Sequence, residues 1–394
     1  MTTRPRLPRT VWVLGLVSLF MDLSSEIVHA LLPLFVTVTL GASVTVLGAI
    51  DGIAEATASF AKLAAGRLSD RNRRRKPWIV LGYGVAALTK PLFALATSPA
   101  TVLGARLIDR TAKGIRGAPR DAMVADETPP EIRGAAYGLR QSLDTVGAFL
   151  APLAAVALMW LLAEDIRAVF WIAVVPGLLS FLLAWLALHE PARHTGAAAR
   201  PPLFGGFREV TAASRQLILI AFVFTLARFS ESFLILKGHQ AGLSLAAAPL
   251  VLVLFNLAYL ALSYPAGTLS DRRSPAAILL AGIGLLVAGN LVLATTASLA
   301  GLAMGVALWG AHMALTQGLF ARLIADTAPE ALRATTFGLF HFITGIATLL
   351  ASVGAGWLWD NHGASAAFFG SAVVAVLAAL LLLASPGRRS VPHG

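Results

Sequence analysis

Ionisable side chains occur inside stretches that are otherwise apolar, and their spacing places them on common helix faces. FMDLSSEIVHALLP contains Asp22, Glu26 and His29, which fall within an arc of about 60° on a helix that turns about 100° per residue. GAIDGIAEATASF contains Asp51 and Glu55, spaced i and i+4. A charge inside hydrocarbon is costly unless it is paired or useful, so these residues indicate a functional site.

A third segment, RLIDRTAKGIRGAPRDA, supplies cations. Arg106, Arg110, Lys113 and Arg120 fall within roughly 80° of one another on a helix, with Arg116 to one side. A carboxylate takes up a proton when its partner cation moves away and releases it when the cation returns. We therefore expect a proton relay, with candidates Asp22, Glu26, Asp51, Glu55 and Arg110.

The same residues allow other interpretations. Asp22, Glu26 and His29 could ligate Zn, Ni or Fe, although the neighbouring cations oppose the binding of another cation. The charges could also form an inert network of buried pairs. The basic excess favours an anionic substrate, and we expect no cofactor and no resident metal. Candidate substrate-binding residues are His29, Arg106, Lys113, Arg116, Arg228, Glu231, Asn256, His312 and Gln317.

The elements that carry these residues are apolar runs of about 20 residues, long enough to cross a bilayer as helices. The 394-residue chain is 57% hydrophobic and 13% charged, whereas soluble domains have about 25% charged residues. We predict an all-α membrane protein with twelve transmembrane helices. They are expected near 11–38, 43–66, 77–97, 99–121, 135–162, 166–188, 214–237, 244–266, 275–296, 298–324, 332–358 and 363–385.

Basic residues alternate from loop to loop. The connections near 39–43, 97–99 and 296–298 have no Lys or Arg, whereas the intervening connections hold nearly all of them. The positive-inside rule then predicts that both termini are cytoplasmic in an inner (plasma) membrane protein. Charges spread over short loops without interleaved aromatics do not indicate a nucleic-acid surface, despite the net charge of +11. Absence of cysteine excludes disulfides and thiolate metal sites.

The chain repeats itself. RGAAYGL at 133 matches RATTFGL at 333, and ADETPPEIR at 125 matches ADTAPEALR at 325, both 200 residues apart. The stretch from 189 to 213 has the Pro, Gly and charge of a linker. We predict two six-helix, pseudo-symmetric halves, 1–188 and 214–394, joined by a linker at 189–213.

Another repeated motif carries a family resemblance. AAGRLSDRNRRRKP starts at residue 64, and PAGTLSDRRSP starts at residue 265. With two six-span halves, the chain resembles the major facilitator superfamily, whose loop motif follows span two. The resemblance implies the fold of that superfamily and a gating role for the motif, here Gly66, Asp70, Arg71 and Arg74 with Gly267, Asp271 and Arg272. Asp70 is expected in a loop outside the span.

Two further segments resemble motifs of the same family. Arg110 and Gly114 match a span-four motif that is associated with proton movement, and GAFLAPLAA is similar to the antiporter signature of span five. Small residues beside a proline would pack that helix tightly, so Gly147 and Pro152 are further gating candidates. The resemblance implies a secondary transporter, with proton-coupled export favoured over proton-coupled uptake and over export of a metal or metal complex.

An enzyme is the least favoured class, because neither an enzyme nor a receptor explains a duplicated gate motif. We expect the chain to act as a monomer. Its predicted partners are protons, a small-molecule substrate (a drug, a metabolite or an anionic solute) and the lipid bilayer.

Overall fold

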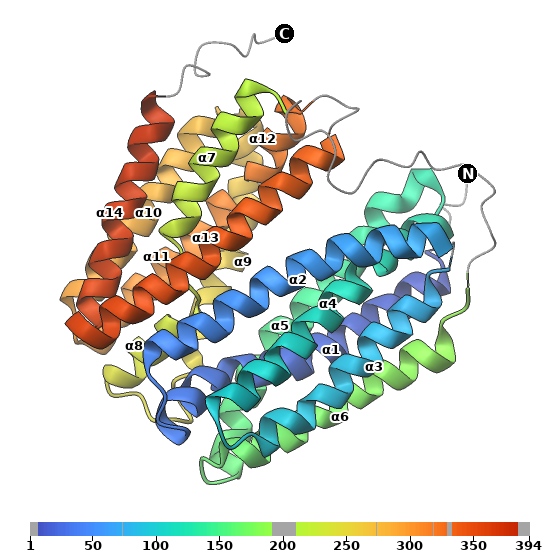
Figure 1. Cartoon of the computed structure of the whole chain (residues 1–394), viewed down its shortest axis with the longest axis horizontal. Coiled ribbons are helices and arrows are strands. Elements are labelled where there is room, and N and C mark those ends of the chain that lie inside the picture. The colour runs from blue at the N-terminus through green and yellow to red at the C-terminus, as the bar shows by residue number, and fades with distance from the viewer. Residues whose placement is uncertain are drawn as a thin grey trace. The chain divides into compact units, whose positions relative to one another are not determined.

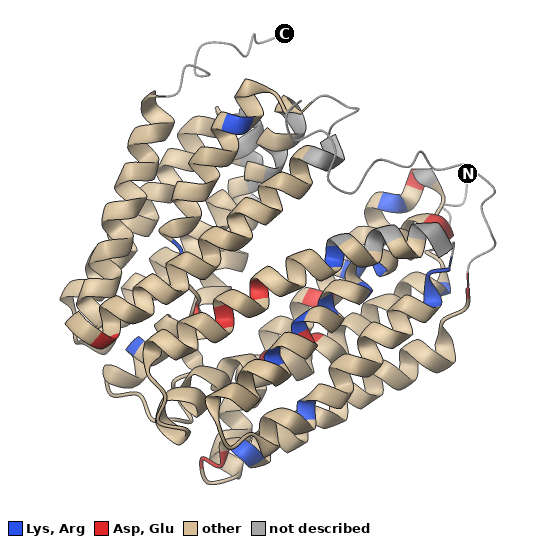
Figure 2. Ribbon diagram, in the orientation of Figure 1, with Lys and Arg blue, Asp and Glu red and all other residues tan. Residues whose placement is uncertain are grey.

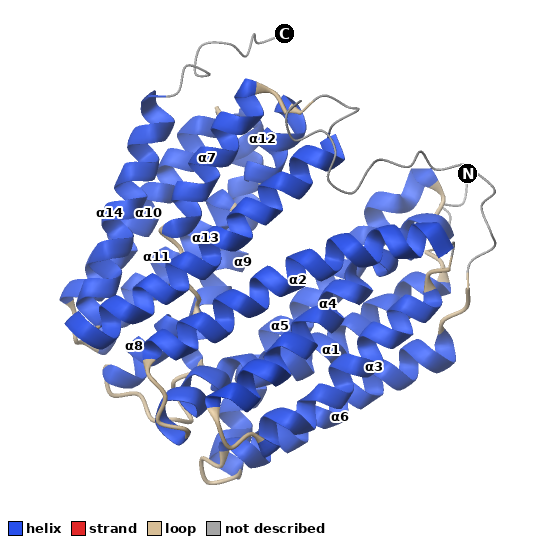
Figure 3. Cartoon of the chain, in the orientation of Figure 1, coloured by secondary structure: helices blue, strands red, loops and turns tan. Residues whose placement is uncertain are grey.

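A computed structural model describes residues 7–72, 74–190, 210–272, 274–317, 319–328 and 333–384. Over these residues the chain is helical, with loops between helices and without strands (Figures 1 and 3). The first half contains α1 (Arg9–Leu34), a π-helical turn (Phe35–Thr39), α2 (Val44–Asn72), α3 (Lys76–Leu95), α4 (Pro99–Glu127), a 3₁₀ turn (Pro130–Ile132), α5 (Arg133–Leu161) and α6 (Ile166–Ala187). The second half contains α7 (Ala212–Leu226), α8 (Ser232–Gln240), α9 (Leu250–Arg272), α10 (Pro275–Thr295), α11 (Leu299–Thr316), α12 (Leu319–Thr327), α13 (Arg333–His362) and α14 (Ala364–Ala384).

The helices account for the predicted spans. Within the described residues, nine helices are long and apolar enough to cross a membrane. The strongly charged α4 does not qualify by composition, and the apolar parts of α7 and α9 are shorter. Each predicted span nevertheless coincides with a helix or a pair of consecutive helices, which confirms the twelve-span, all-α fold.

The chain divides into two compact units. Unit 1 comprises Met1–Ala42, Ile53–Ala199 and Leu245–Leu250, and unit 2 comprises Ser43–Gly52, Arg200–Ser244 and Val251–Gly394. The division passes through α2, whose first residues belong to unit 2.

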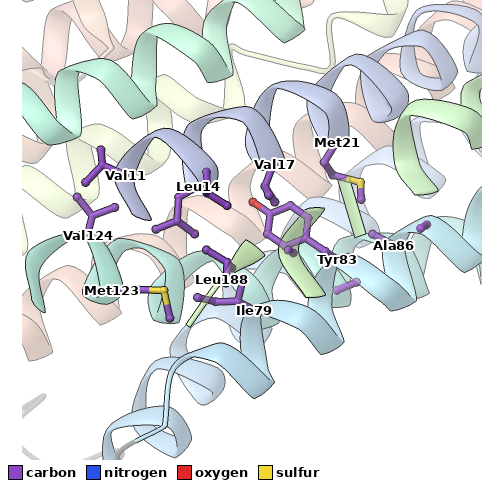
Figure 4. Packing of buried hydrophobic residues seen from close by; sticks show 14 of the residues in the cluster. Val11, Leu14, Val17, Met21, Ile79, Tyr83, Ala86, Met123, Val124 and Leu188 are labelled. Atoms are coloured by element: carbon purple, nitrogen blue, oxygen red, sulfur yellow. The ribbon is translucent and has the colours of Figure 1, made fainter. Parts of the chain in front are cut away.

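The core of unit 1 is apolar and lies where α1, α3 and α4 meet, with a contribution from the end of α6 (Figure 4). Fully buried residues there include Val17, Met21, Ile79 and Tyr83. Glycines bring the helices together, because a side chain at Gly82 would meet Arg116 and the Ala112 carbonyl of α4. Close backbone approach at small residues is the usual means of helix packing in bilayers.

Unit 2 has a buried polar network that holds its helices. Trp309 of α11 donates from Nε1 to Asn290 Oδ1 of α10 at 2.9 Å. Asn290 donates from Nδ2 to Ser371 Oγ of α14 at 2.7 Å, and Ser371 donates to the carbonyl oxygen of Ala227 at 2.5 Å. Because Ala227 follows the last residue of α7, the network satisfies a carbonyl that the helix end leaves open.

The seventh and tenth spans are interrupted, which the sequence did not predict. Span seven consists of α7 and α8 with residues 227–231 between them. Span ten consists of α11 and α12, and Gln317 lies just after α11. Side chains of unit 2 also satisfy the backbone of the first interruption, because the Ser230 amide donates to Ser352 Oγ at 3.2 Å. Non-helical backbone at membrane depth requires such internal partners.

The end of α2 also differs from expectation. The helix continues to Asn72, so the backbone of Asp70 is helical, whereas we expected a loop. The predicted gate motif therefore begins within the last turns of the second span.

Candidate functional site

The charged residues gather in unit 1 around α4, which has two charged faces (Figure 2). Arg106, Arg110 and Lys113 follow one another at helical spacing and lie toward α1 and α2. Asp109 and Arg116 lie on another face, toward α3. This second face explains why Arg116 stands apart from the other cations in the predicted arc.

Close packing of α2 and α4 determines which charges meet. A side chain at Gly114 would collide with the Ala58 carbonyl, so the two backbones approach closely there. One turn earlier on each helix, Arg110 Nη1 lies 3.2 Å from Glu55 Oε1. The Arg110 side chain is 5% exposed and that of Glu55 is 50% exposed, so the pair joins a buried cation to an accessible acid.

His29 and Arg106 form a second contact between α1 and α4. Arg106 Nη2 lies 2.8 Å from His29 Nδ1. A guanidinium can only donate, so Nδ1 accepts and the proton of the neutral ring is on Nε2. His29 Nδ1 is thus occupied by an arginine, which opposes the use of this nitrogen as a metal ligand.

The acids of α1 lie next to these cations. Glu26 interacts electrostatically with Lys113, Arg110 and Arg106. Lys113 is exposed, whereas Arg106 and Arg110 are buried. The cluster therefore has an accessible edge at Glu55 and Lys113 and a buried interior.

Asp22 has an acidic partner that the sequence did not reveal. Its carboxyl group lies close to that of Asp144 of α5, and the two acids interact electrostatically. Asp144 also lies 3.6 Å from Arg120 Nη1 and 3.9 Å from Arg140 Nη1. Two cations therefore lie beside this pair of acids.

A buried ion pair on the other face of α4 was also missed. Lys90 Nζ of α3 lies 2.7 Å from Asp109 Oδ1 and donates to Ser25 Oγ of α1 at 2.9 Å. Both charged side chains are almost completely buried. The charged residues within the apolar segments ALTKPLF and RLIDRT are the sequence signals that could have revealed this pair. Nearby, the Arg116 guanidinium lies 4.7 Å from the centre of the Tyr83 ring.

In unit 2 the candidate residues lie at the two interruptions. Arg228, in the break of span seven, donates to Met313 Sδ at 2.6 Å and lies 5.8 Å from the centre of the Phe224 ring. Glu231 occupies the N-cap position of α8 and interacts electrostatically with Arg228. His312 of α11 is fully buried, with its ring centre 5.9 Å from that of Phe224. The structure thus brings Arg228 and His312 to the same aromatic ring.

Two other candidates of unit 2 are less buried than His312. Gln317 is exposed at the end of α11. Asn256 lies in α9 and is half-buried. Their place at a binding site stays a prediction.

Asp51, on the same face of α2 as Glu55, has hydrogen-bond partners in unit 2. Its Oδ2 accepts hydrogen bonds from Ser230 Oγ at 2.6 Å and Ser232 Oγ at 2.5 Å. Asp51 is 3% exposed and belongs to unit 2. The two acids, one turn apart on α2, therefore belong to different units.

Two of the gating candidates, Gly147 and Pro152, lie in α5. A side chain at Gly147 would collide with the Leu19 carbonyl of α1, and Pro152 is buried in the same helix, α5. Arg74 is exposed and lines a shallow cavity of about 280 Å³ with Pro77, Trp78 and Leu81. The side chains of the remaining gating candidates lie outside the described residues: Gly66, Asp70, Arg71, Gly267, Asp271 and Arg272.

Over the described part of the chain, no group of three or more His, Asp or Glu side chains is placed to hold a metal ion. Asp22, Glu26 and His29 share a helix face but interact instead with other protein groups.

A helical membrane protein with a duplicated sequence, interrupted spans and paired charges inside its helices has the features of the secondary-transporter class. The chain belongs to the Major Facilitator Superfamily, whose family model matches residues 14–249 and 217–393. It is 30% identical to an MFS-type transporter of Methanocaldococcus jannaschii over 96% of this chain and 95% of that protein.

More distant similarities agree with the fold. The chain is 25% identical to the multidrug resistance protein MdtH of Photorhabdus laumondii subsp. laumondii, covering 87% of this chain and 85% of that protein. A crystal structure of a bacterial homolog of the human lysosomal transporter Spinster, inward-facing and unoccupied, aligns with a TM-score of 0.75 at 19% identity, covering 96% of this chain and 97% of that one. The crystal structure of a mutant of the nucleoside transporter NupG aligns with a TM-score of 0.80 at 15% identity, covering 95% of this chain and 99% of that one.

Proposed function

We propose that the protein is a secondary active transporter that exports a small molecule in exchange for protons by alternating access. The observation that supports this most strongly is the charged cluster of unit 1, in which carboxyl groups of α1, α2 and α5 meet cations of α4. Buried ion pairs rarely stabilise a protein more than apolar packing would. Their concentration inside membrane helices therefore favours a role in transport.

The cluster supplies the parts of a proton relay. Asp22 interacts electrostatically with Asp144, so the two acids would share a proton in this relay, and Glu26 lies next to the exposed Lys113. Movement of the cations of α4 relative to these acids would change how tightly the acids hold protons. Arg110, paired with the accessible Glu55, would link this exchange to the medium.

Export is favoured over uptake by two observations. The GAFLAPLAA segment packs tightly against α1 at Gly147, as expected for a helix that limits leaks. Distant relatives include multidrug resistance proteins. The cationic face of α4 and the arginine at the break of span seven favour a substrate with an anionic group, although drugs and neutral metabolites are further candidates.

The remaining parts of the proposal concern orientation and gating. Both termini are assigned to the cytoplasm, and the membrane is the inner (plasma) membrane, because the basic loops alternate. The two copies of the arginine-rich motif, around Asp70 and Asp271, are assigned to gating rather than substrate binding. The acting species is a monomer.

The test uses proteoliposomes with an imposed pH gradient, screened over anionic metabolites, cationic drugs and metal complexes. Once a substrate is found, Glu26→Gln and Asp22→Asn should abolish gradient-driven transport while preserving substrate counterflow, which needs no net proton movement. Glu131→Gln, at an exposed acid of the 3₁₀ turn, is the matched control and should retain both activities.

Other results would change the assignment. Accumulation in the direction of proton flow would identify a symporter. Loss of metal-dependent transport and counterflow together would indicate a metal ligand role for the α1 acids. Full gradient-driven transport by both variants would leave the cluster with a structural role only.

A further inference from the structure

The first residues of α2 are attached to unit 2 at their N-terminal end. Asp360, near the end of α13, accepts from the Val44 amide at 2.9 Å and from the Thr45 amide at 2.8 Å. A carboxylate at a helix N-terminus satisfies open amides and interacts favourably with the helix dipole. The start of α2 therefore depends on an acid from a distant part of the sequence.

Glycines attach the same segment along its length. A side chain at Gly48 would collide with the Ser352 carbonyl of α13, and one at Gly52 would collide with Leu349. Gly48 and Gly52 form a G-x-x-x-G pair, the spacing that lets two membrane helices approach to backbone contact. Such an interface has little side-chain interdigitation, so its polar contacts strongly affect its strength.

The main polar contact inside this interface comes from Asp51. Its carboxylate accepts from Ser230 and Ser232, and Ser232 is the first residue of α8. The negative charge thus lies at a helix N-terminus and receives two charge-assisted hydrogen bonds, which are about twice as strong as neutral ones. A proton on Asp51 would remove both advantages.

We propose that Asp51 is a positioning residue that holds the start of α2 against the break in span seven, and that binding of a proton to Asp51 releases it. This role deepens the proton-coupled exchange proposed above and rests on it. In that scheme Asp51 acts through the position of α8 and not by contact with substrate. Release would free both the first turns of α2 and the interrupted seventh span to rearrange.

The surroundings of Asp51 fit this role. On α2 the nearest acid is Glu55, one turn later, which is paired with Arg110 of unit 1. The break contributes Arg228 and Glu231, which interact with each other, and α13 contributes Asp360 at the far end of the segment. The two serine partners donate from hydroxyl groups, which remain uncharged when Asp51 takes up a proton.

The test measures attachment directly. Spin labels at Val46→Cys and Trp357→Cys, two exposed positions on α2 and α13, report their separation by EPR in lipid nanodiscs, and the chain has no native cysteine to remove. Acidification should convert a short-distance population into a longer one. Asp51→Asn should shift the ratio toward the longer distance on the order of tenfold at neutral pH, comparable with the loss of one charge-assisted hydrogen bond, and should no longer respond to acid.

Controls separate the possible causes. Glu131→Gln, which removes an exposed acid of unit 1, should keep the wild-type acid response. Ser230→Ala combined with Ser232→Ala removes the two donors but keeps the carboxylate, and this double variant should also favour the longer distance. If Asp51→Asn does not fold, the double variant tests the proposal in its place. Wild-type distances in the serine double variant, or an unchanged acid response in Asp51→Asn, would overturn the proposal. The distance measurement needs neither substrate nor a pH gradient. Failure of proton-driven export in proteoliposomes would therefore contradict the proposed function without changing the outcome of the distance measurement.

Discussion

Lys90 and Asp109 show how individual charges are accommodated in this molecule. The two groups are 2.7 Å apart and nearly inaccessible, and Lys90 also donates a hydrogen bond to Ser25. Each group neutralises the charge of the other, which would otherwise be isolated in an apolar core. A pair of this kind contributes little by forming but costs much when it is broken.

We therefore expect Lys90→Met to lower the free energy of unfolding by about 3–5 kcal/mol, because Asp109 would remain as a buried, uncompensated charge. Thermal unfolding in detergent, followed by tryptophan fluorescence, would measure the loss. Lys90→Met combined with Asp109→Leu should recover most of it. Equal instability of the single and double variants would contradict this assignment.

Sequence reasoning identified charged residues better than it identified their partners. It selected Glu55, Arg110 and His29 as candidates, because mid-span charges and helical spacing are visible in sequence, whereas the Glu55–Arg110 and His29–Arg106 contacts come from the structure. It missed Asp144, because the contact between two acids depends on how α1 and α5 pack. It also grouped Asp51 with Glu55, whereas the glycines at 48 and 52 bring Asp51 into unit 2.

Among the helices, α1 and α5 show how glycine controls packing. The Gly147 position lies directly against the Leu19 carbonyl, whereas Gly138, on the same helix, has open space around the position of a Cβ. The two glycines thus share a helix but differ in environment.

This difference predicts substitutions of opposite sign. Gly147→Ala should destabilise the protein by about 1–3 kcal/mol through steric overlap with α1. Gly138→Ala should stabilise it by up to about 1 kcal/mol, because alanine is the better helix former. Unfolding temperatures of the purified variants would test both, and destabilisation by both substitutions would argue against close packing at Gly147 as the cause.

The twelve spans were predictable because apolar length is a strong signal. The interruptions in spans seven and ten were not. The stretch ARFSE between α7 and α8 contains neither glycine nor proline, and its helix ends are stabilised by Ser352 and Ser371 from distant helices. Only tertiary structure supplies those partners.

For the molecule as a whole, the proposed orientation makes a direct prediction. Cysteines at Ser98 and Thr195 should react with membrane-impermeant reagents from opposite sides, because an odd number of spans separates these positions. The cysteine-free chain provides a clean background. Right-side-out and inverted vesicles give the comparison, and labelling of both sites from one side would refute the topology.

The two units differ in their content of charge. Unit 1 holds the buried arginines, lysines and acids around α4, whereas the spans of unit 2 carry few charged side chains over the described residues (Figure 2). An electric field exerts force only on charge, and moving one elementary charge through 100 mV changes its energy by about 2.3 kcal/mol. The membrane potential of a living cell would therefore act more on the charges within the spans of unit 1 than on the spans of unit 2.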